Sequence, residues 1–319
     1  YSCSRWSDVF PRRRSHQEVF DGLIMSFGIW QASIKLEFKK DKDKTIMVRN
    51  LHYGPLVVQK PFYSEVACHV YLLHPPGGVA SCDHLSVEAK ANEHSQVLIT
   101  TPGATKFYKG ENNCSLFEQN FYVEENASLE YLPAQNIFYK GTHTKVKTTF
   151  YLKDNSRFAF RDVSKCGMKD EERPFENSSL FNTVTIIENG KEKLIETSFI
   201  DGQDDLEALS GNYGCVYTGT YITNKVCEDT LEKIRALLDT CLSYDKSSDP
   251  LKVDSTLSET DSKKQTRFFA AAGVVDNYTV VRFLSSKNEA IEKAIVEIWK
   301  LTRQETIGLA PCLPRIWST

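Results

Sequence analysis

The chain lacks the motifs of several common enzyme classes and lacks any long apolar run. It contains no GxxxxGK[ST], GxGxxG, GxSxG or HExxH motif, so phosphate-loop hydrolysis, dinucleotide redox chemistry and zincin chemistry have no support in the sequence. Apolar runs stay shorter than the roughly 18 residues that a transmembrane helix needs. The first residues are charged but are not followed by the apolar core and small-residue cleavage site of a signal peptide.

The chain also lacks an excess of charge of one sign. Its 39 basic and 42 acidic residues give a formal net charge of -3, whereas a general nucleic-acid-binding protein carries a strongly basic face. Its nine cysteines are odd in number, widely spaced and without a CxxC pair, which is typical of reduced cytosolic thiols and not of a disulfide framework. We therefore expect a cytoplasmic protein with neither nucleic-acid nor membrane partners.

The size and composition are those of an ordinary folded protein. A chain of 319 residues with 41% hydrophobic side chains buries about three quarters of its unfolded surface and needs no metal or disulfide to hold a core. Residues 1–27 precede the first patterned strand and contain the short basic run Arg12-Arg13-Arg14. We expect them to be an unstructured extension, and residues 28–319 to form a single domain.

Strand character dominates the pattern. Ile34–Phe38 alternates apolar and polar residues, the period of a half-buried strand. Asn189-Gly190 between two such runs predicts a hairpin. Many short strands with frequent turns predict a mainly β fold of layered, sandwich-like sheets with antiparallel pairing. The expected strands are residues 34–38, 45–51, 56–59, 69–73, 97–101, 117–123, 129–132, 146–152, 157–160, 183–187, 193–199, 216–222, 267–275 and 279–284.

Two α-helices are expected in the C-terminal part. Residues 229–242 carry Leu231, Ile234, Leu238 and Cys241 at the spacing of an amphipathic helix. A second helix follows a capping box formed by Ser286 and Glu289 and ends near Arg303. Its apolar stripe consists of Ile291, Ala294, Ile295, Ile298 and Trp299. The intervening residues 243–265 are rich in Ser, Asp and Lys and are expected to form a loop.

One cluster of metal-ligating residue types surrounds the turn Pro75-Pro76-Gly77-Gly78. Thiol, imidazole and carboxylate groups are all competent ligands for nickel or zinc, so this cluster is a candidate metal site. The spacing is not that of a fixed site, and the two histidines nearest the turn are equally compatible with ordinary hydrogen-bonded strand and turn positions. The residues concerned are Cys68, His69, His74, Cys82, Asp83 and His84.

Five segments, in order, resemble the signature words of the UreD/UreH family of urease accessory proteins. They run from about residue 30 to the end of the chain, and their combination is highly specific. The words are Gly54-Pro55-Leu56-Val57-Val58-Gln59-Lys60-Pro61-Phe62-Tyr63-Ser64-Glu65, Cys68-His69-Val70-Tyr71-Leu72-Leu73-His74-Pro75-Pro76-Gly77-Gly78-Val79, Leu98-Ile99-Thr100-Thr101-Pro102-Gly103-Ala104-Thr105-Lys106-Phe107-Tyr108, Leu129-Glu130-Tyr131-Leu132-Pro133 and Leu313-Pro314-Arg315-Ile316-Trp317-Ser318-Thr319.

The resemblance implies a fold and a role. The fold is a β protein of stacked, helically arranged sheets, antiparallel or mixed, with two helices near the C-terminal part. The role is that of a non-catalytic accessory protein that joins a UreF-type helical protein and a UreG-type GTPase, docks on apo-urease and assists nickel insertion, with an internal tunnel as the route. The resemblance further implies that nickel passes through the protein and that no cofactor is tightly bound. It also allows a dimer of the accessory complex.

A tunnel for a divalent ion needs polar groups that bind transiently, because a tight closed site would trap the metal. Residues inside or beside the family words supply such groups: Glu65, His69, His74, Cys82, Asp83 and Glu130. The remaining word residues are expected to be structural: Gly54, Pro55, Gln59, Pro75, Pro76, Gly77, Gly78, Pro102, Gly103, Pro133, Pro314, Arg315 and Trp317.

The chain departs from the family pattern at a few positions. Ser64 replaces a proline, Ser81 and Cys82 replace two glycines, and Asn136 replaces a carboxylate, which leaves the course of the metal path open. Two other classes of function also stay open. One is a stand-alone nickel-binding module, and the other is a β-rich hydrolase with dispersed carboxylates, for which the sequence offers no paired acid and base motif.

Overall fold

The structure is a computed structural model that describes residues 30–318 except 81, 111–113, 169–170 and 244–266. The expected extension at residues 1–27 and nearly all of the expected loop at 243–265 lie outside the described residues. The chain divides into two units, Tyr1–Trp30 and Gln31–Thr319. Of the first unit only Trp30 is described, so the fold below is that of the second unit.

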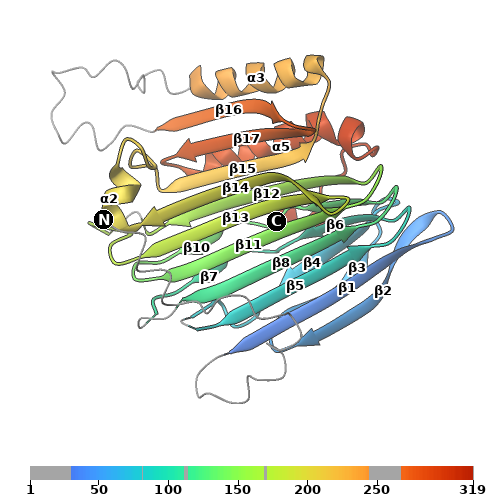
Figure 1. Ribbon diagram of the computed structural model, residues 1–319, viewed down its shortest axis with the longest axis horizontal. Helices are drawn as coiled ribbons and strands as arrows, with labels where there is room; N and C mark the ends of the chain where they lie inside the picture. The colour runs from blue at the N-terminus through green and yellow to red at the C-terminus, as the bar shows by residue number, and fades with distance from the viewer. Residues whose placement is uncertain (1–29, 81, 111–113, 169–170, 244–266, 319) are drawn as a thin grey trace. The chain divides into compact units, whose positions relative to one another are not determined.

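Seven strands form the first sheet (Figure 1). Side chains on these strands alternate between buried and solvated positions, as in β5 and β8, because successive residues of a strand point to opposite faces. In spatial order the strands are β14 (Lys191–Asp201), β13 (Ser179–Glu188), β11 (His143–Leu152), β8 (Ser115–Val123), β5 (His84–Ala91), β1 (Gln31–Asp41) and β2 (Lys44–Tyr53).

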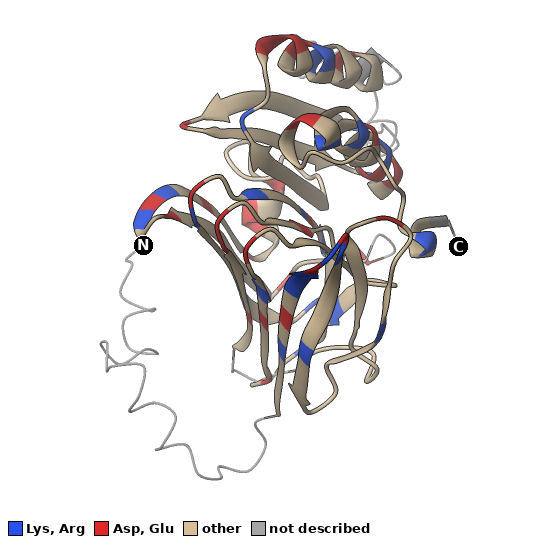
Figure 2. Ribbon diagram, turned by 90° about the vertical axis from the view of Figure 1, so that its right-hand side faces the viewer, with Lys and Arg blue, Asp and Glu red and all other residues tan. Residues whose placement is uncertain are grey.

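Ten strands form the second sheet, which faces the first as a separate layer when seen edge-on (Figure 2). Its main path runs through β16 (Phe268–Val275), β17 (Tyr278–Ser285), β15 (Tyr217–Asn224), β12 (Arg157–Cys166), β9 (Ser128–Tyr131), β6 (Gln96–Thr100), β4 (Cys68–Leu73) and β3 (Val57–Phe62). The short strands β7 (Thr105–Phe107) and β10 (Asn136–Phe138) pair with each other, and β10 also pairs with β12.

The two sheets are wound from one continuous coil. The chain passes from β5 in the first sheet to β6 in the second, returns to β8, and repeats the circuit through β9, β11 and β12. Each circuit enters a sheet in the same direction, so neighbouring strands such as β5 and β8 or β6 and β9 pair in parallel. The hairpins at the sheet edges pair antiparallel. The expected mainly β fold of helically arranged, mixed sheets is confirmed, and antiparallel pairing alone is wrong for the coil.

The core lies between the sheets and is rich in aromatic rings. Phe121 and Phe150 stack with centroids 4.9 Å apart, and Phe150 lies 4.9 Å from Phe158 of the opposite sheet. Each fully buried aromatic side chain of this kind contributes about 1.5–3 kcal/mol of hydrophobic stabilisation. The coil is therefore stabilised by side chains that pack between the two sheets and by the hydrogen bonds between neighbouring strands of each sheet.

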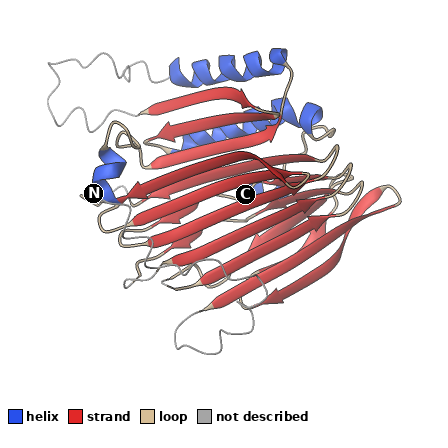
Figure 3. Cartoon of the chain, in the orientation of Figure 1, coloured by secondary structure: helices blue, strands red, loops and turns tan. Residues whose placement is uncertain are grey.

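Helix α5 (Asn288–Thr306) covers the outer face of the second sheet, and α3 (Glu228–Ser243) packs against α5 and β16 (Figure 3). Both lie where the apolar stripes predicted helices. The predicted capping box is wrong: the N-cap is Lys287 without a side-chain cap, and the Ser286 hydroxyl accepts from the Arg267 amide instead. Two short helices, α2 (Gly202–Glu207) and the 3-10 turn η2 (Arg315–Ser318), were not expected.

The hairpin predicted at Asn189-Gly190 joins β13 and β14 and is confirmed. Strand β5 was missed, although it is central in the first sheet. Its alternating buried side chains are Leu85, Val87, Ala89 and Ala91, and two alanines make a weak strand signal because alanine is depleted in strands. None of the described helices is long and apolar enough to cross a membrane.

Candidate functional site

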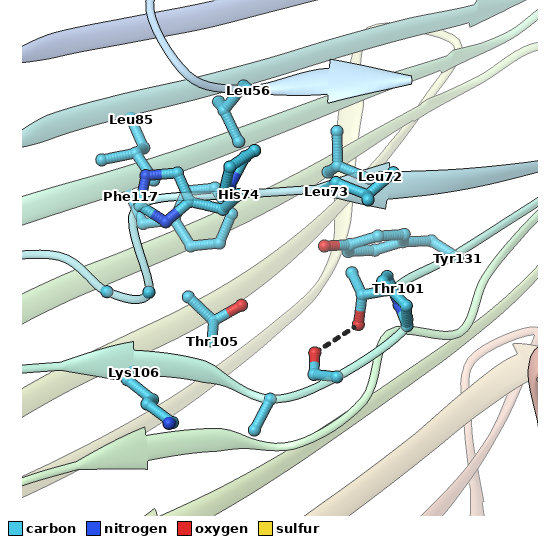
Figure 4. A pocket seen from close by; sticks show the side chains of 16 residues that line it. Leu56, Leu72, Leu73, His74, Leu85, Thr101, Thr105, Lys106, Phe117 and Tyr131 are labelled. Atoms are coloured by element: carbon cyan, nitrogen blue, oxygen red, sulfur yellow. Dashed lines mark hydrogen bonds between the residues drawn. The ribbon is translucent and has the colours of Figure 1, made fainter. Parts of the chain in front are cut away.

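Four of the five family words meet at one end of the coil, around a cavity of about 190 Å³ that we call the motif cavity. Its wall is formed by Leu56, His74, Pro75, Gly77, Gly78, Thr101, Pro102, Gly103, Thr105, Phe117 and Tyr131. Figure 4 shows the Thr105 side chain pointing into this space and the Thr101 hydroxyl bonded to the Gly103 carbonyl at 3.0 Å. These four words are spread over residues 54–133 and lie on successive strands and turns of the coil, so the coil brings them around one cavity.

His74, Cys82 and Asp83 lie at the motif cavity end. The Asp83 carboxylate accepts the Ala80 amide at 2.7 Å and closes a turn. Burial lowers the pKa of His74, and the charge of Asp83 partly opposes that effect. The imidazole is therefore neutral at physiological pH, the form that can ligate a metal. Of the three, only His74 lines the motif cavity, and the Asp83 carboxylate is near enough to act on its pKa.

Cys82 adopts a left-handed backbone conformation with φ of +66°, at one of the positions where the family has glycine. Such a conformation costs an ordinary L-residue about 1–2 kcal/mol and costs glycine almost nothing. We expect Cys82→Gly to raise the free energy of unfolding by about 1 kcal/mol, measured by urea denaturation. Cys82→Ser, which changes the side chain but keeps the backbone cost, should leave stability within about 0.5 kcal/mol. A destabilising Cys82→Gly would contradict this.

The other three predicted path residues lie in a second place, around the guanidinium of Arg303 on α5. Arg303 is fully buried. Its Nη2 donates to Glu65 Oε1 at 2.5 Å and to Glu130 Oε2 at 2.8 Å, and its Nη1 donates to the Ala310 carbonyl at 2.5 Å. Trp299 Nε1 donates to Glu130 at 2.6 Å, and His69 Nε2 lies 2.7 Å from Glu65. We call Glu65, His69, Glu130, Trp299 and Arg303 the arginine cluster.

The charged groups of the arginine cluster stabilise one another's charged forms. Burial alone would lower the pKa of Arg303, but the Glu130 and Glu65 carboxylates raise it above its ordinary value. Burial alone would raise the pKa of Glu65, but hydrogen bonds from His69 and Arg303 hold it below its ordinary value. Both carboxylates thus already have a resident cation. Nickel at Glu65, His69 or Glu130 stays a prediction, and at either carboxylate it would have to displace Arg303.

A row of polar side chains crosses the inner face of the second sheet. Thr105, Asn136, Ser164 and Thr218 occupy paired positions on β7, β10, β12 and β15. We call these four residues the polar row. Adjacent strands lie about 4.8 Å apart, so the polar row spans about 14 Å from Thr105 in the motif cavity to Thr218. Buried Ser164 Oγ has no hydrogen-bond partner among the described residues.

Asp162 lies beside the polar row. It is only 9% exposed, accepts from Asn136 Nδ2 at 3.1 Å and from Asn182 Nδ2 at 2.5 Å. Burial raises its pKa, and the two amides and Arg161 oppose that effect only in part. Across the layer, the Tyr131 hydroxyl donates to Gln119, whose amide donates to Thr148 at 3.0 Å. The interior between the sheets is therefore polar along this line.

The polar row ends in a groove of about 540 Å³ at the far edge of the sheets, which we call the edge groove. It is lined by Asp162, Asn182, Glu196, Ser198, Asn212, Thr218, Thr220 and Arg282, among others. Within the described residues, no group of three or more His, Cys, Asp or Glu side chains is arranged to hold a metal ion. Oxygen ligands from single carboxylates, amides and hydroxyls are what the molecule offers a cation here.

The chain matches the family described as UreD urease accessory protein over residues 31–318. The chain belongs to this family. Proteins named urease accessory protein UreD from Enterobacter sp. (strain 638), Aliivibrio fischeri (strain ATCC 700601 / ES114) and Klebsiella aerogenes are 32%, 31% and 30% identical to it. Each alignment covers 91% of this chain and 96%, 96% and 97% of the relative.

Two word residues of this UreD chain, Gly78 and Trp317, have contacts that explain a structural role. A Cβ on Gly78 would lie 2.2 Å from the Tyr108 ring, so only glycine fits there. Trp317 Nε1 donates to Thr100 at 3.1 Å, and its ring meets Trp299 edge-on at 5.5 Å, which fastens the last word to the core. Pro133 and Pro314 are buried, whereas Gln59 and Arg315 are exposed.

Two positions at which the chain departs from the family pattern are Ser64 and Ser81. The Ser64 hydroxyl accepts a weak hydrogen bond from the Cys312 thiol at 3.8 Å, and Ser81 lies outside the described residues.

Two residues central to these sites were not predicted from the UreD sequence. Arg303 lies four residues after Trp299, so it continues the apolar stripe of α5; an arginine there signals a buried charge that needs carboxylates. Asp162 follows the apolar residues 158–160 in the same strand, where a carboxylate is out of pattern. The expected strand ended at residue 160, so the signal from Asp162 was not used.

Proposed function

We propose that this chain is a non-catalytic scaffold for urease maturation that assembles with UreF-type and UreG-type partners on apo-urease and lets nickel pass through its interior. The membership of the UreD family supports the accessory role. The observation that supports the route is the polar row, which runs between the two sheets from Thr105 at the motif cavity to Thr218 at the edge groove.

The chemistry of the polar row suits passage better than storage. Hydroxyl and amide oxygens replace part of the hydration shell of a divalent ion but hold it weakly. Asp162 is the only carboxylate among the described residues that contacts the row through a hydrogen bond, to Asn136, so a cation finds one charged stop and no closed cage. A site with three or four thiolate or imidazole ligands would instead retain the metal.

The position of Asn136 fits this reading. At this position the family carries a carboxylate, and here Asn136 donates to Asp162 at 3.1 Å. Two adjacent buried carboxylates would repel each other and raise one pKa strongly. With an amide, Asp162 keeps its charge more easily and remains the one carboxylate, among the described residues, that is hydrogen-bonded to the polar row.

The role is tested by urease activation in cells that lack this chain. We expect urease activity and bound nickel to fall to background, to return with the wild-type chain, and the chain to co-purify with apo-urease in the presence of its helical partner. Normal activation without the chain would overturn the accessory role in this organism. Turnover by the purified chain alone would instead favour an enzyme, and tight stoichiometric nickel binding by it a metal reservoir.

The route is tested by narrowing the polar row. We expect Ser164→Val to slow nickel-dependent activation at least threefold, because it replaces an inward hydroxyl with two methyl groups. Ser128→Val is the matched control: Ser128 is also buried on a strand of the second sheet, its Oγ also has no partner among the described residues, and it lies outside the row. Equal effects of both variants on activation, at equal amounts of folded protein, would contradict the proposed route.

A further inference from the structure

One ion pair bridges the two sheets over the edge groove. Arg282 of β17 donates through Nε and Nη2 to both carboxylate oxygens of Glu196 on β14, each at 2.6 Å. Strand β14 is the edge of the first sheet and β17 belongs to the second. The pair therefore spans the space between the layers, at the end where the polar row reaches the surface.

The strand register places the guanidinium on the same line as the buried carboxylate. Asp162 is paired with Thr220, and Thr220 is paired with Arg282, on the same inner face. Two inter-strand spacings separate the Cα atoms of Asp162 and Arg282 by about 10 Å. On the opposite sheet, Glu196 lies next to Val184, two residues along β13 from Asn182, which donates to Asp162.

The floor of the edge groove has polar atoms that nothing in the described part of the chain satisfies. Asn182 Oδ1 is buried without a hydrogen-bond partner while its Nδ2 donates to Asp162. Asn212 Nδ2, on a residue only 7% exposed, is likewise without a partner. Buried polar atoms of this kind normally bind water or an ion. The Asn182 amide would have to turn over to bring this oxygen to the Asp162 carboxylate, and an amide oxygen beside a carboxylate is a suitable pair of ligands for a divalent cation.

We infer that the Glu196–Arg282 ion pair is a gate over a weak divalent-cation site formed by Asp162 and Asn182 at the floor of the edge groove. This inference rests on the proposed nickel route and names its regulation at one end. In the closed state the guanidinium holds the Glu196 carboxylate and places a positive charge over the floor. A cation approaching Asp162 is repelled and finds Glu196 already occupied.

The gate can open because the pair is exposed. The side chains of Arg282 and Glu196 are 51% and 24% exposed, and exposed ion pairs hold together only weakly even with two-pronged geometry. When Arg282 turns outward, Glu196 is freed as a second carboxylate above Asp162. One movement thus removes a positive charge from the groove and supplies a negative one.

The two members of the pair should therefore have opposite effects on metal binding. With Mn²⁺ as the probe, followed by electron paramagnetic resonance on the full chain, we expect Arg282→Gln to tighten binding at least threefold. We expect Glu196→Gln to weaken it at least threefold, since this variant lacks the second carboxylate that the open gate would supply above Asp162. Adding Asp162→Asn to Arg282→Gln should abolish the gain.

Lys193 supplies the matched control. It pairs with Asp276 at 3.2 Å, linking the same two sheet edges, and neither residue lines the edge groove. Lys193→Gln removes the same charge as Arg282→Gln and should leave Mn²⁺ binding unchanged. Equal shifts for Lys193→Gln and Arg282→Gln, or shifts of one sign for Arg282→Gln and Glu196→Gln, would overturn the gate.

Urease activation separates failure of the gate from failure of the route. If activation in cells does not depend on this chain, the proposed function fails, whatever the Mn²⁺ measurements give. If activation depends on the chain but Arg282→Gln and Glu196→Gln leave both Mn²⁺ binding and the activation rate unchanged, only the gate fails. The gate predicts faster activation with Arg282→Gln and slower activation with Glu196→Gln.

Discussion

Replacement of Arg303 by methionine is expected to lower the free energy of unfolding by about 3–5 kcal/mol. The variant leaves Glu65 and Glu130 without their cation; Glu130 is 1% exposed, so water cannot replace the guanidinium. It also frees the Ala310 carbonyl and the chain that leads to the last family word. Urea denaturation followed by tryptophan fluorescence measures the loss, since Trp299 lies in the arginine cluster.

Arg235→Met is the control for this prediction. Arg235 pairs with Glu228 and Glu232 on the exposed side of α3, where all three side chains are at least 43% exposed. Exposed pairs of this kind contribute at most about 1 kcal/mol. A loss below about 1 kcal/mol in Arg303→Met would show that the arginine cluster does not hold the C-terminal part to the sheets.

The arginine cluster also fixes a pH dependence. The folded pKa of Glu65 is lowered, so the unfolded chain binds more protons at acid pH. The stability that Glu65 contributes is complete above its unfolded pKa of about 4.3 and is lost as the pH falls through its lower folded pKa. In Arg303→Met the loss of stability with falling pH should become shallower, because the His69 hydrogen bond to Glu65 remains but the Arg303 hydrogen bond and charge, which also lower its pKa, are gone.

Asp162→Asn is expected to separate function from stability. Nickel-dependent urease activation should slow at least tenfold, since a loss of only about 1.4 kcal/mol of attraction for the passing cation gives that factor. Stability at pH 7 should stay the same or rise. The new amide can be accommodated because Asn182 can turn its amide and accept with the oxygen that now lacks a partner.

The sign of the stability effect follows from the raised pKa of Asp162. A carboxyl group with a raised folded pKa stabilises the fold below its unfolded value of about 3.9, and this contribution is lost as the pH rises through the folded value. Asparagine does not titrate, so the stability of the variant does not fall as the pH rises through the folded pKa of Asp162. Comparing denaturation of wild type and Asp162→Asn at pH 4 and pH 7 measures it. Wild-type activation by a stable Asp162→Asn chain would remove Asp162 from the proposed route.

Local patterns were enough for most elements of the fold. The alternation in Ile34–Phe38 lies in β1, and the apolar stripe of residues 291–299 lies in α5. Strand β5 was missed because its inward positions include Ala89 and Ala91, which carry little strand preference. Local patterns did not predict which strands pair in parallel, because pairing depends on where each circuit of the chain returns; mixed sheets were expected only from the family resemblance.

The candidate residues were predicted by type and not by partner. His74 and Asp83 lie close enough to interact at the motif cavity end, as the cluster around the glycine turn predicted. Glu65 and Glu130 were chosen as carboxylates inside family words, yet each hydrogen-bonds Arg303, which lies 238 and 173 residues away in the sequence. A carboxylate in a word can receive nickel or an arginine, and spacing within the word cannot distinguish the two.

By itself the sequence determined the family, the β-rich class of fold, the two C-terminal helices and the positions of most strands, because these follow from words and periodicities within short segments. Only the tertiary structure decided which polar groups share a space. The coil aligns Thr105, Asn136, Ser164 and Thr218 through strand register, and α5 carries Arg303 onto two distant carboxylates. These contacts depend on long-range packing between the two sheets and α5. The pKa of a buried ionisable group depends on the partner that this packing places beside it.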